Sequence, residues 1–144
     1  MKITAIIAAI WTAIAGAIIG LASPAHADKG LRFQTPSGNI SCSVSADNSD
    51  RGVAVCDIGD HTWAPPSNCG PGMSERFSLA QGDSRVFCFN GPLLVAGVGT
   101  LDYGQTQFFS GITCDSEPDP AGVTCTDTTT GHFFRASRDS YELG

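Results

Sequence analysis

The chain has little positive charge, because only eight lysine and arginine residues stand against fourteen aspartate and glutamate residues. A protein that binds duplex nucleic acid needs a basic surface to neutralise phosphates, and anionic lipid surfaces attract polybasic segments. The basic residues of this chain are few and scattered. Nucleic acid and anionic membrane surfaces are therefore not expected as partners.

The sequence also lacks the usual patterns of metal ligands. It contains no C-x-x-C pair, and His61 and His132 lie at no zinc-site spacing from a cysteine. Asp115, Glu117 and Asp119 alternate, but prolines at 118 and 120 stiffen a backbone that a calcium loop needs to be flexible. We expect neither a metal nor another cofactor.

A catalytic grouping is missing as well. His132, Ser137 and Asp139 provide the chemical parts of a nucleophilic triad. A nucleophilic serine normally lies on a sharp turn among glycines, whereas Ser137 stands between Ala136 and Arg138. We therefore predict no catalytic residues. A small secreted hydrolase that uses His132 with Ser137 or a carboxylate is the alternative.

The beginning of the chain has the pattern of an export signal. Met1 and Lys2 precede residues 3–22, which contain no charged side chain, and Ala25-His26-Ala27 follows. A positive start, an apolar stretch and small residues at positions −3 and −1 are typical of a cleaved signal peptide. We predict a signal peptide over 1–27, with a retained membrane anchor as the alternative. The remaining domain, 28–144, is then secreted or associated with the cell envelope and no longer attached to a membrane.

Removal of residues 1–27 takes away one basic residue and no acidic one, which leaves a formal side-chain charge of −7. The remaining length suits one domain with a modest core. Its cysteines are even in number and all follow the cleavage site, at Cys42, Cys56, Cys69, Cys88, Cys114 and Cys125. In an exported chain this pattern indicates disulfides.

Strand patterns narrow the fifteen possible pairings of six cysteines. A hairpin turning at position 49 places Cys42 opposite Cys56 and unites their apolar neighbours on one face. A second hairpin, turning between Asp119 and Pro120, places Cys114 opposite Cys125. Cys69 and Cys88 then pair by elimination.

Short β-branched and aromatic runs, separated by many of the chain's seventeen glycines and eight prolines, are typical of an all-β fold. We predict a compact, disulfide-stapled β-sandwich or irregular barrel built from hairpins. The segment 73–80 is the one place where we expect that a helical turn could form.

Aromatic side chains are the best binding candidates, because a flat ring stacks on a sugar or a peptide. In the pairs Phe108-Phe109 and Phe133-Phe134 a strand directs one ring inward and the other outward. Packing in the core is the alternative use of each ring. The candidate ligand-binding residues are Trp63, Tyr103, Phe109, His132, Phe133 and Arg138.

Several segments together resemble a small secreted domain family of unknown function from actinobacteria. They are Phe33-x-Thr35-Pro36-Ser37-Gly38-Asn39-Ile40-x-Cys42, Cys56-Asp57-Ile58, Trp63-Ala64-Pro65-Pro66, Leu101-x-Tyr103-Gly104, Gly122-Val123-Thr124-Cys125, Gly131-His132 and Ser137-Arg138-x-x-Tyr141. The resemblance implies an exported β domain and assigns no activity. Where such domains have Gly-His-Gly-Phe, this chain has a phenylalanine at 133 in place of the second glycine.

These observations favour a non-catalytic binding module for an envelope polymer, a peptide or another protein. Besides the hydrolase, one further alternative is an enzyme inhibitor that acts through a rigid loop over 65–71.

Overall fold

The computed structural model describes residues 30–91 and 98–144, and within these ranges the chain forms eleven strands and no helix. The predicted signal peptide over 1–27 lies outside the described residues. Because the described part contains no helix, it offers none long and apolar enough to span a membrane.

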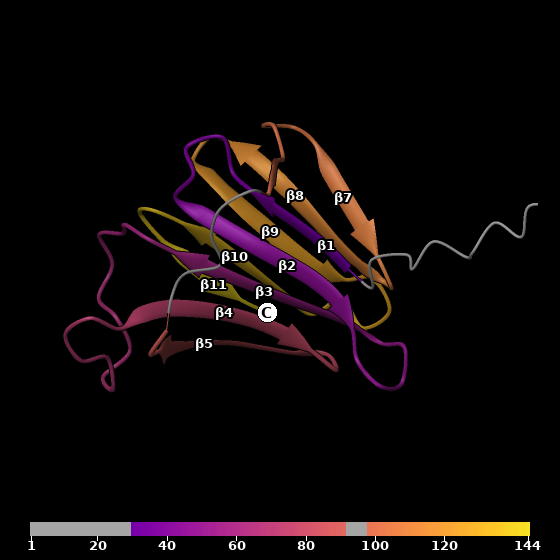
Figure 1. Ribbon diagram of the computed structural model, residues 1–144, viewed down its shortest axis with the longest axis horizontal. Helices are drawn as coiled ribbons and strands as arrows, with labels where there is room; N and C mark the ends of the chain where they lie inside the picture. The colour runs from indigo at the N-terminus through magenta and orange to yellow at the C-terminus, as the bar shows by residue number, and fades with distance from the viewer. Residues whose placement is uncertain (1–29, 92–97) are drawn as a thin grey trace, which may run out of the picture.

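The strands form two sheets that lie face to face (Figure 1). Sheet A has the spatial order β5 (Asp83–Phe89), β4 (Ser74–Ala80), β3 (Gly52–Ile58), β2 (Ile40–Ala46), β1 (Gly30–Gln34) and β6 (Gly99–Thr100). Sheet B has the order β11 (Tyr141–Leu143), β10 (Phe133–Ser137), β9 (Ala121–Asp127), β8 (Ile112–Pro118) and β7 (Thr106–Phe109). The predicted all-β sandwich built from hairpins is confirmed.

The first predicted hairpin forms in the predicted register. Cys42 lies directly opposite Cys56, their α-carbons are 4.1 Å apart, and the two residues form a disulfide. Ile40 lies opposite Ile58 in the same ladder. The alternation of apolar residues therefore identified both the register and the bridge, because a shift by one residue turns every side chain to the other face.

The other two predicted bridges are also present. Cys114 lies opposite Cys125 across β8 and β9, with α-carbons 4.1 Å apart. Cys69, in the loop before β4, is bonded to Cys88 on β5, with α-carbons 5.2 Å apart. Three disulfides are compatible with an oxidising, extracellular environment.

The two hairpin bridges meet in the middle of the sandwich. The sulfur atoms of Cys42, Cys56 and Cys125 all lie within 4.8 Å of one another, and these residues are completely buried. Since each sulfur is held in a disulfide, the group has no thiolate for a metal. Beside it the rings of Phe77 and Phe134 pack with centroids 5.5 Å apart, one from each sheet.

The prediction of a helical turn within 73–80 is wrong, because residues 74–80 form strand β4. Glu75, Phe77 and Leu79 point inward and are buried, which is the period-two pattern of a strand. β4 lies between β3 and β5 and pairs with both. This pairing on two sides outweighs the weak local preference for a turn of helix.

Candidate binding site

A cavity of about 290 Å³ opens at the end of the sandwich where β2 begins and β3 ends. Four connections contribute to it: the β1–β2 turn, the loops after β3 and β10, and the segment before β7. The start of β9 completes the wall. Its lining residues are Thr35, Ser37, Asn39, Ile40, Asp60, Tyr103, Ala121, Gly122 and Arg138.

The β1–β2 turn is fixed by its own sequence. The amide of Gly38 donates to the carbonyl oxygen of Thr35 at 2.8 Å, and Gly38 has a φ of 72°. Proline at the second position and glycine at the fourth suit a turn of this kind. Glycine also accepts the left-handed backbone at no steric cost. The turn thus carries Ser37 and Asn39 to the cavity wall.

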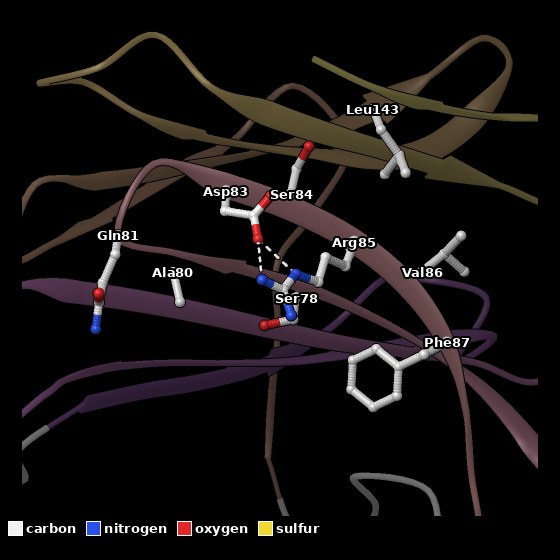
Figure 2. A pocket seen from close by; sticks show the side chains of 9 residues that line it. All are labelled: Ser78, Ala80, Gln81, Asp83, Ser84, Arg85, Val86, Phe87 and Leu143. Carbon is white, nitrogen blue, oxygen red and sulfur yellow. Dashed lines mark hydrogen bonds and ion pairs between the residues drawn. The ribbon is translucent and has the colours of Figure 1, made fainter.

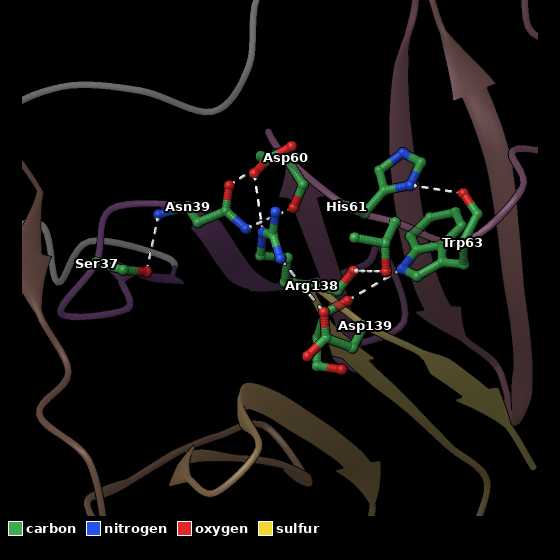
Figure 3. Close-up of polar contacts among 9 residues, drawn as sticks. Ser37, Asn39, Asp60, His61, Trp63, Arg138 and Asp139 are labelled. Carbon is green, nitrogen blue, oxygen red and sulfur yellow. Dashed lines mark hydrogen bonds and ion pairs between the residues drawn. The ribbon is translucent and has the colours of Figure 1, made fainter.

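Asn39 joins this turn to the loop after β3. Its side-chain amide donates to the carbonyl oxygen of Asp60 at 2.8 Å, and its carbonyl oxygen accepts the amide of Asp60 at 2.7 Å (Figure 3). The amide of Gly59 also donates to the backbone oxygen of Asn39 at 2.9 Å. These hydrogen bonds fix the backbone of Asp60, so that its carboxylate lies at the mouth of the cavity.

Arg138 connects that carboxylate to sheet B. Its Nε donates to Asp60 Oδ2 at 3.0 Å, and its Nη1 lies 3.5 Å from Asp139 Oδ1 (Figure 3). The hydrogen bond that Arg138 donates to the Asp60 carboxylate raises the pKa of Arg138 above its ordinary value. All three side chains are more than half exposed. One cation between two carboxylates leaves a net charge of −1 at the mouth, which disfavours an anionic ligand.

Behind Arg138, Trp63 holds the two sheets together at this end. Its indole nitrogen donates to the backbone oxygen of Ser137 at 3.0 Å, and its ring stacks on His61 with centroids 3.6 Å apart. The Trp63 ring also makes an edge-to-face contact with the ring of Tyr141, with centroids 4.8 Å apart. The indole is partly buried against the core. These contacts use Trp63 for internal packing and leave little of its ring for a ligand.

The ring of His61 has an acceptor at each nitrogen. Nδ1 lies 2.9 Å from the backbone oxygen of Trp63, and Nε2 lies 3.0 Å from Glu75 Oε2. A carbonyl oxygen only accepts, so Nδ1 carries a hydrogen. On the other side of the ring, the Glu75 carboxylate is the polar partner of Nε2. Both side chains are only about one-tenth exposed, at 11% and 10%, so this pair is a buried polar support.

The structure brings only part of the predicted site together. Tyr103 and Arg138 line the cavity, and Trp63 bonds the backbone oxygen of Ser137, the residue before Arg138. His132 and Phe133 lie at the other end of β10, roughly 16–20 Å from Arg138 by the rise of an extended strand. Tyr103 is 38% exposed and has no hydrogen-bond partner among the residues that the structure describes.

Phe109 is placed elsewhere. It packs against the core, whereas its neighbour Phe108 is 64% exposed on the outer face of sheet B. One ring therefore points inward and the other outward, as the strand rule requires. The pattern did not indicate which of the two would be exposed.

The residues weighed for catalysis are separated. Ser137 is buried, and its Oγ donates to the backbone oxygen of Ser140 at 2.8 Å and accepts the Ser140 amide at 3.1 Å. His132 is exposed at the opposite end of β10. A hydroxyl held in a turn and an imidazole at this distance do not form a nucleophile and its base.

Two of the three acidic residues considered for calcium, Asp115 and Glu117, have other partners. Glu117 accepts Arg135 Nε at 2.8 Å and the hydroxyl of Thr124 at 2.5 Å. Asp115 accepts the hydroxyl of Thr106. Both carboxylates lie on the outer face of sheet B, where they bond neighbouring strands rather than converge on an ion.

Two residues at this end of the molecule, Asp60 and His61, could not be identified from the sequence. Asp60 meets Arg138 across 78 positions, and His61, in the loop after β3, meets Glu75 on β4. Comparison with known families, curated proteins and solved structures finds no match for the chain. The resemblance to the actinobacterial family therefore stays a prediction.

Proposed function

We propose that this chain is a secreted or cell-envelope binding module without catalytic activity, and that the cavity between Tyr103 and Arg138 holds its ligand. The observation that carries the proposal is the convergence of separate segments on one small cavity, with an exposed phenol on its wall. At about 290 Å³, the cavity is at the lower end of ligand pockets and suits a single ring.

The groups around the cavity favour a neutral ligand that carries hydroxyl groups. Asp60 offers a carboxylate acceptor, Arg138 a guanidinium donor, and Ser37 a hydroxyl that can donate or accept. The Tyr103 ring supplies a surface for stacking. A hexose unit of an envelope polysaccharide meets these requirements, whereas a phosphate or carboxylate ligand would face the net negative charge of the mouth.

The resemblance in sequence agrees with this location. Seven of the nine lining residues fall in the segments on which the resemblance depends, and the two that do not are Asp60 and Ala121. These segments are far apart in the chain, and the fold gathers them at one end. We infer that a shared ligand site, if the family has one, is this cavity.

Retention on isolated cell-wall material tests the proposal, together with a glycan array. Tyr103→Ala and Arg138→Ala should each lower retention by about tenfold or more, because each removes a contact worth roughly 1.4 kcal/mol. Phe108→Ala and Arg51→Ala are matched controls, since both side chains are exposed and neither lines the cavity. Retention that is equal in all four variants would place the binding surface elsewhere.

One observation favours the inhibitor alternative. The loop over 65–71 is mostly exposed and is fastened to β5 by the Cys69–Cys88 bridge. A rigid exposed loop binds an enzyme cleft at a low cost in conformational entropy. Inhibition of lysozymes or proteases that survives Arg138→Ala and disappears with Cys69→Ala/Cys88→Ala would establish this function instead.

A further inference from the structure

Strand β5 forms an open edge of sheet A. It pairs with β4 on one side, and no described strand pairs with its other side. A groove of about 950 Å³ runs along this edge and reaches Leu143 on β11, the edge strand of sheet B (Figure 2). Natural sheets protect such edges with proline, with charged side chains and above all lysine, or with bulges. The sequence of β5, DSRVFCF, contains neither proline nor lysine, and its register to β4 shows no bulge. Its two charged side chains, Asp83 and Arg85, form an ion pair with each other.

The β4–β5 turn identifies the backbone groups that face this edge. Gln81 and Gly82 have φ values of 54° and 72°, which is the signature of a type I′ two-residue loop. The residues that close such a loop, Ala80 and Asp83, exchange backbone hydrogen bonds. The β10–β11 hairpin shows the same rule, because the amide of Ser137 donates to the oxygen of Ser140 across a two-residue loop.

Hydrogen bonding then alternates along β5. Asp83, Arg85, Phe87 and Phe89 direct their backbone groups to β4, and Ser84, Val86 and Cys88 direct theirs to the free edge. Three amides and three carbonyl oxygens in a row thus have no strand partner among the described residues. Such a row is a template for one more antiparallel strand.

The side chains of β5 are suited to a strand of the same sequence. Arg85 and Asp83 form an ion pair with each other, so the edge carries no net charge in a chain that is otherwise acidic. Phe87 is 36% exposed beside Arg85. An arginine already covers a phenylalanine on this sheet, where the guanidinium of Arg76 lies 3.5 Å above the ring of Phe89. Arginine facing phenylalanine is thus a favourable contact here.

We propose that two copies of this chain associate by antiparallel pairing of their β5 strands about a two-fold axis at Val86. This register pairs all seven residues of β5, places Val86 opposite its own copy and sets each Arg85 opposite Phe87 of the partner subunit. The free amides and carbonyls of Ser84, Val86 and Cys88 then all find partners. The two copies of sheet A become one continuous sheet.

Placing the two-fold axis at another residue of β5 gives other symmetric registers, and these are less favourable. An axis at Arg85 places two guanidinium groups opposite each other, which is repulsive. An axis at Ser84 runs the partner's strand onto the turn at Gln81 and leaves Phe87 and Phe89 unpaired. An axis at Phe87 sets Asp83 opposite Gly91, which lies beyond the end of the strand.

Sedimentation equilibrium of the disulfide-bonded chain tests the proposal. We expect a doubled mass at concentrations of about 100 μM, because an interface of one strand pair belongs to the small, weak class. Val86→Pro removes an amide that faces the free edge and none that bonds β4, so it should return the mass to that of a monomer. Val86→Thr keeps the shape and the amide and should remain a dimer.

A second measurement fixes the register. Val86→Cys places two thiols opposite each other at the axis, at a Cα separation of about 5.5 Å that a disulfide can bridge. Mild oxidation of the folded variant should cross-link it at least tenfold faster than Ser84→Cys. Faster cross-linking of Ser84→Cys would overturn the register.

Arg85→Asp covers the case in which Val86→Pro fails to fold, because the Arg85 side chain is 73% exposed and its replacement leaves the core intact. It should also give a monomer, since it removes the contact with the partner's Phe87 and adds two acidic groups. A wild-type chain that is monomeric at this concentration would overturn the proposal. A dimer that survives Val86→Pro or Arg85→Asp would do the same, as would a monomer that instead captures an extended peptide.

Discussion

The hairpin bridges and the loop bridge place the same covalent bond in opposite surroundings. Cys42–Cys56 joins opposed residues of β2 and β3, and both residues are buried in the core. Cys69–Cys88 joins a loop to an edge strand, and both residues are half-exposed. The first bond adds apolar volume to a packed core, whereas the second only restricts a loop. Their contributions to stability should therefore differ in kind.

Loop entropy by itself would rank these bridges the other way. The sequence separation is 19 for Cys69–Cys88 and 14 for Cys42–Cys56, so the chain-entropy model favours the loop bridge by about 0.3 kcal/mol. Removal of buried sulfur from a packed core leaves a cavity that costs far more than this difference. Comparing the stability of the two cysteine double mutants therefore separates the contribution of core packing from that of loop entropy.

The largest expected effect is that of Cys42→Ala/Cys56→Ala. We expect the free energy of unfolding to fall by about 4–6 kcal/mol, from roughly 3 kcal/mol of lost loop restraint together with the cavity between the sheets. Guanidinium denaturation followed by tryptophan fluorescence measures it. A loss no larger than that of the loop-bridge variant would mean that packing of the sulfur atoms contributes nothing.

The corresponding loss for Cys69→Ala/Cys88→Ala should be about 3 kcal/mol, because half-exposed sulfurs leave no sealed cavity and only the loop restraint is lost. The denaturation midpoint should shift with an unchanged slope. A larger effect than in the core variant would reverse the comparison.

Hydrogen exchange sharpens the comparison residue by residue. Removal of the loop bridge should speed exchange of the Cys69 and Met73 amides, which donate only to Pro66 and Gly70 inside the loop. Amides of β2 and β3 should still exchange only through global unfolding. Equal acceleration in both regions would show that the loop and the core open together.

The smallest expected effect concerns the turn that the first bridge closes. The backbone amides of Arg51 and Ser49 donate to the Asp47 carboxylate and lower its pKa below the ordinary value of 3.8. A lowered pKa in the folded state contributes stability above the unfolded value, and this contribution is lost as the pH falls through the folded value. Asp47→Asn should therefore flatten the acid side of a profile of melting temperature against pH below about 4. An unchanged acid slope would contradict it.

The sequence predicted local pairing well and contacts between distant segments poorly. Cys42 and Cys56 are separated by a short turn, and the parity of their apolar neighbours determines which residues face each other. β4 was ambiguous because its stability depends on β3 and β5 on either side. A strand between two others needs less local signal than a strand at an edge.

The candidate site depends on contacts between residues that are far apart in the sequence. Tyr103 and Arg138 were selected as individual residues, but their common cavity depends on Asp60, which reaches Arg138 across the gap between two sheets. Phe108 and Phe109 were known to point in opposite directions, yet the direction of the core depends on sheet A. Alternation gives the period of a strand and not which face is covered.

The meeting of the hairpin bridges inside the sandwich also has a consequence for attack by reducing agents. A thiolate must reach a disulfide sulfur directly, and Cys42, Cys56, Cys114 and Cys125 have at most 2% of their surface exposed. Reductant should therefore open Cys69–Cys88 first, while the chain stays folded. The two inner bonds can react only after the sheets have separated. At saturating reductant, the rate at which these two bonds are reduced should therefore equal the rate of global unfolding.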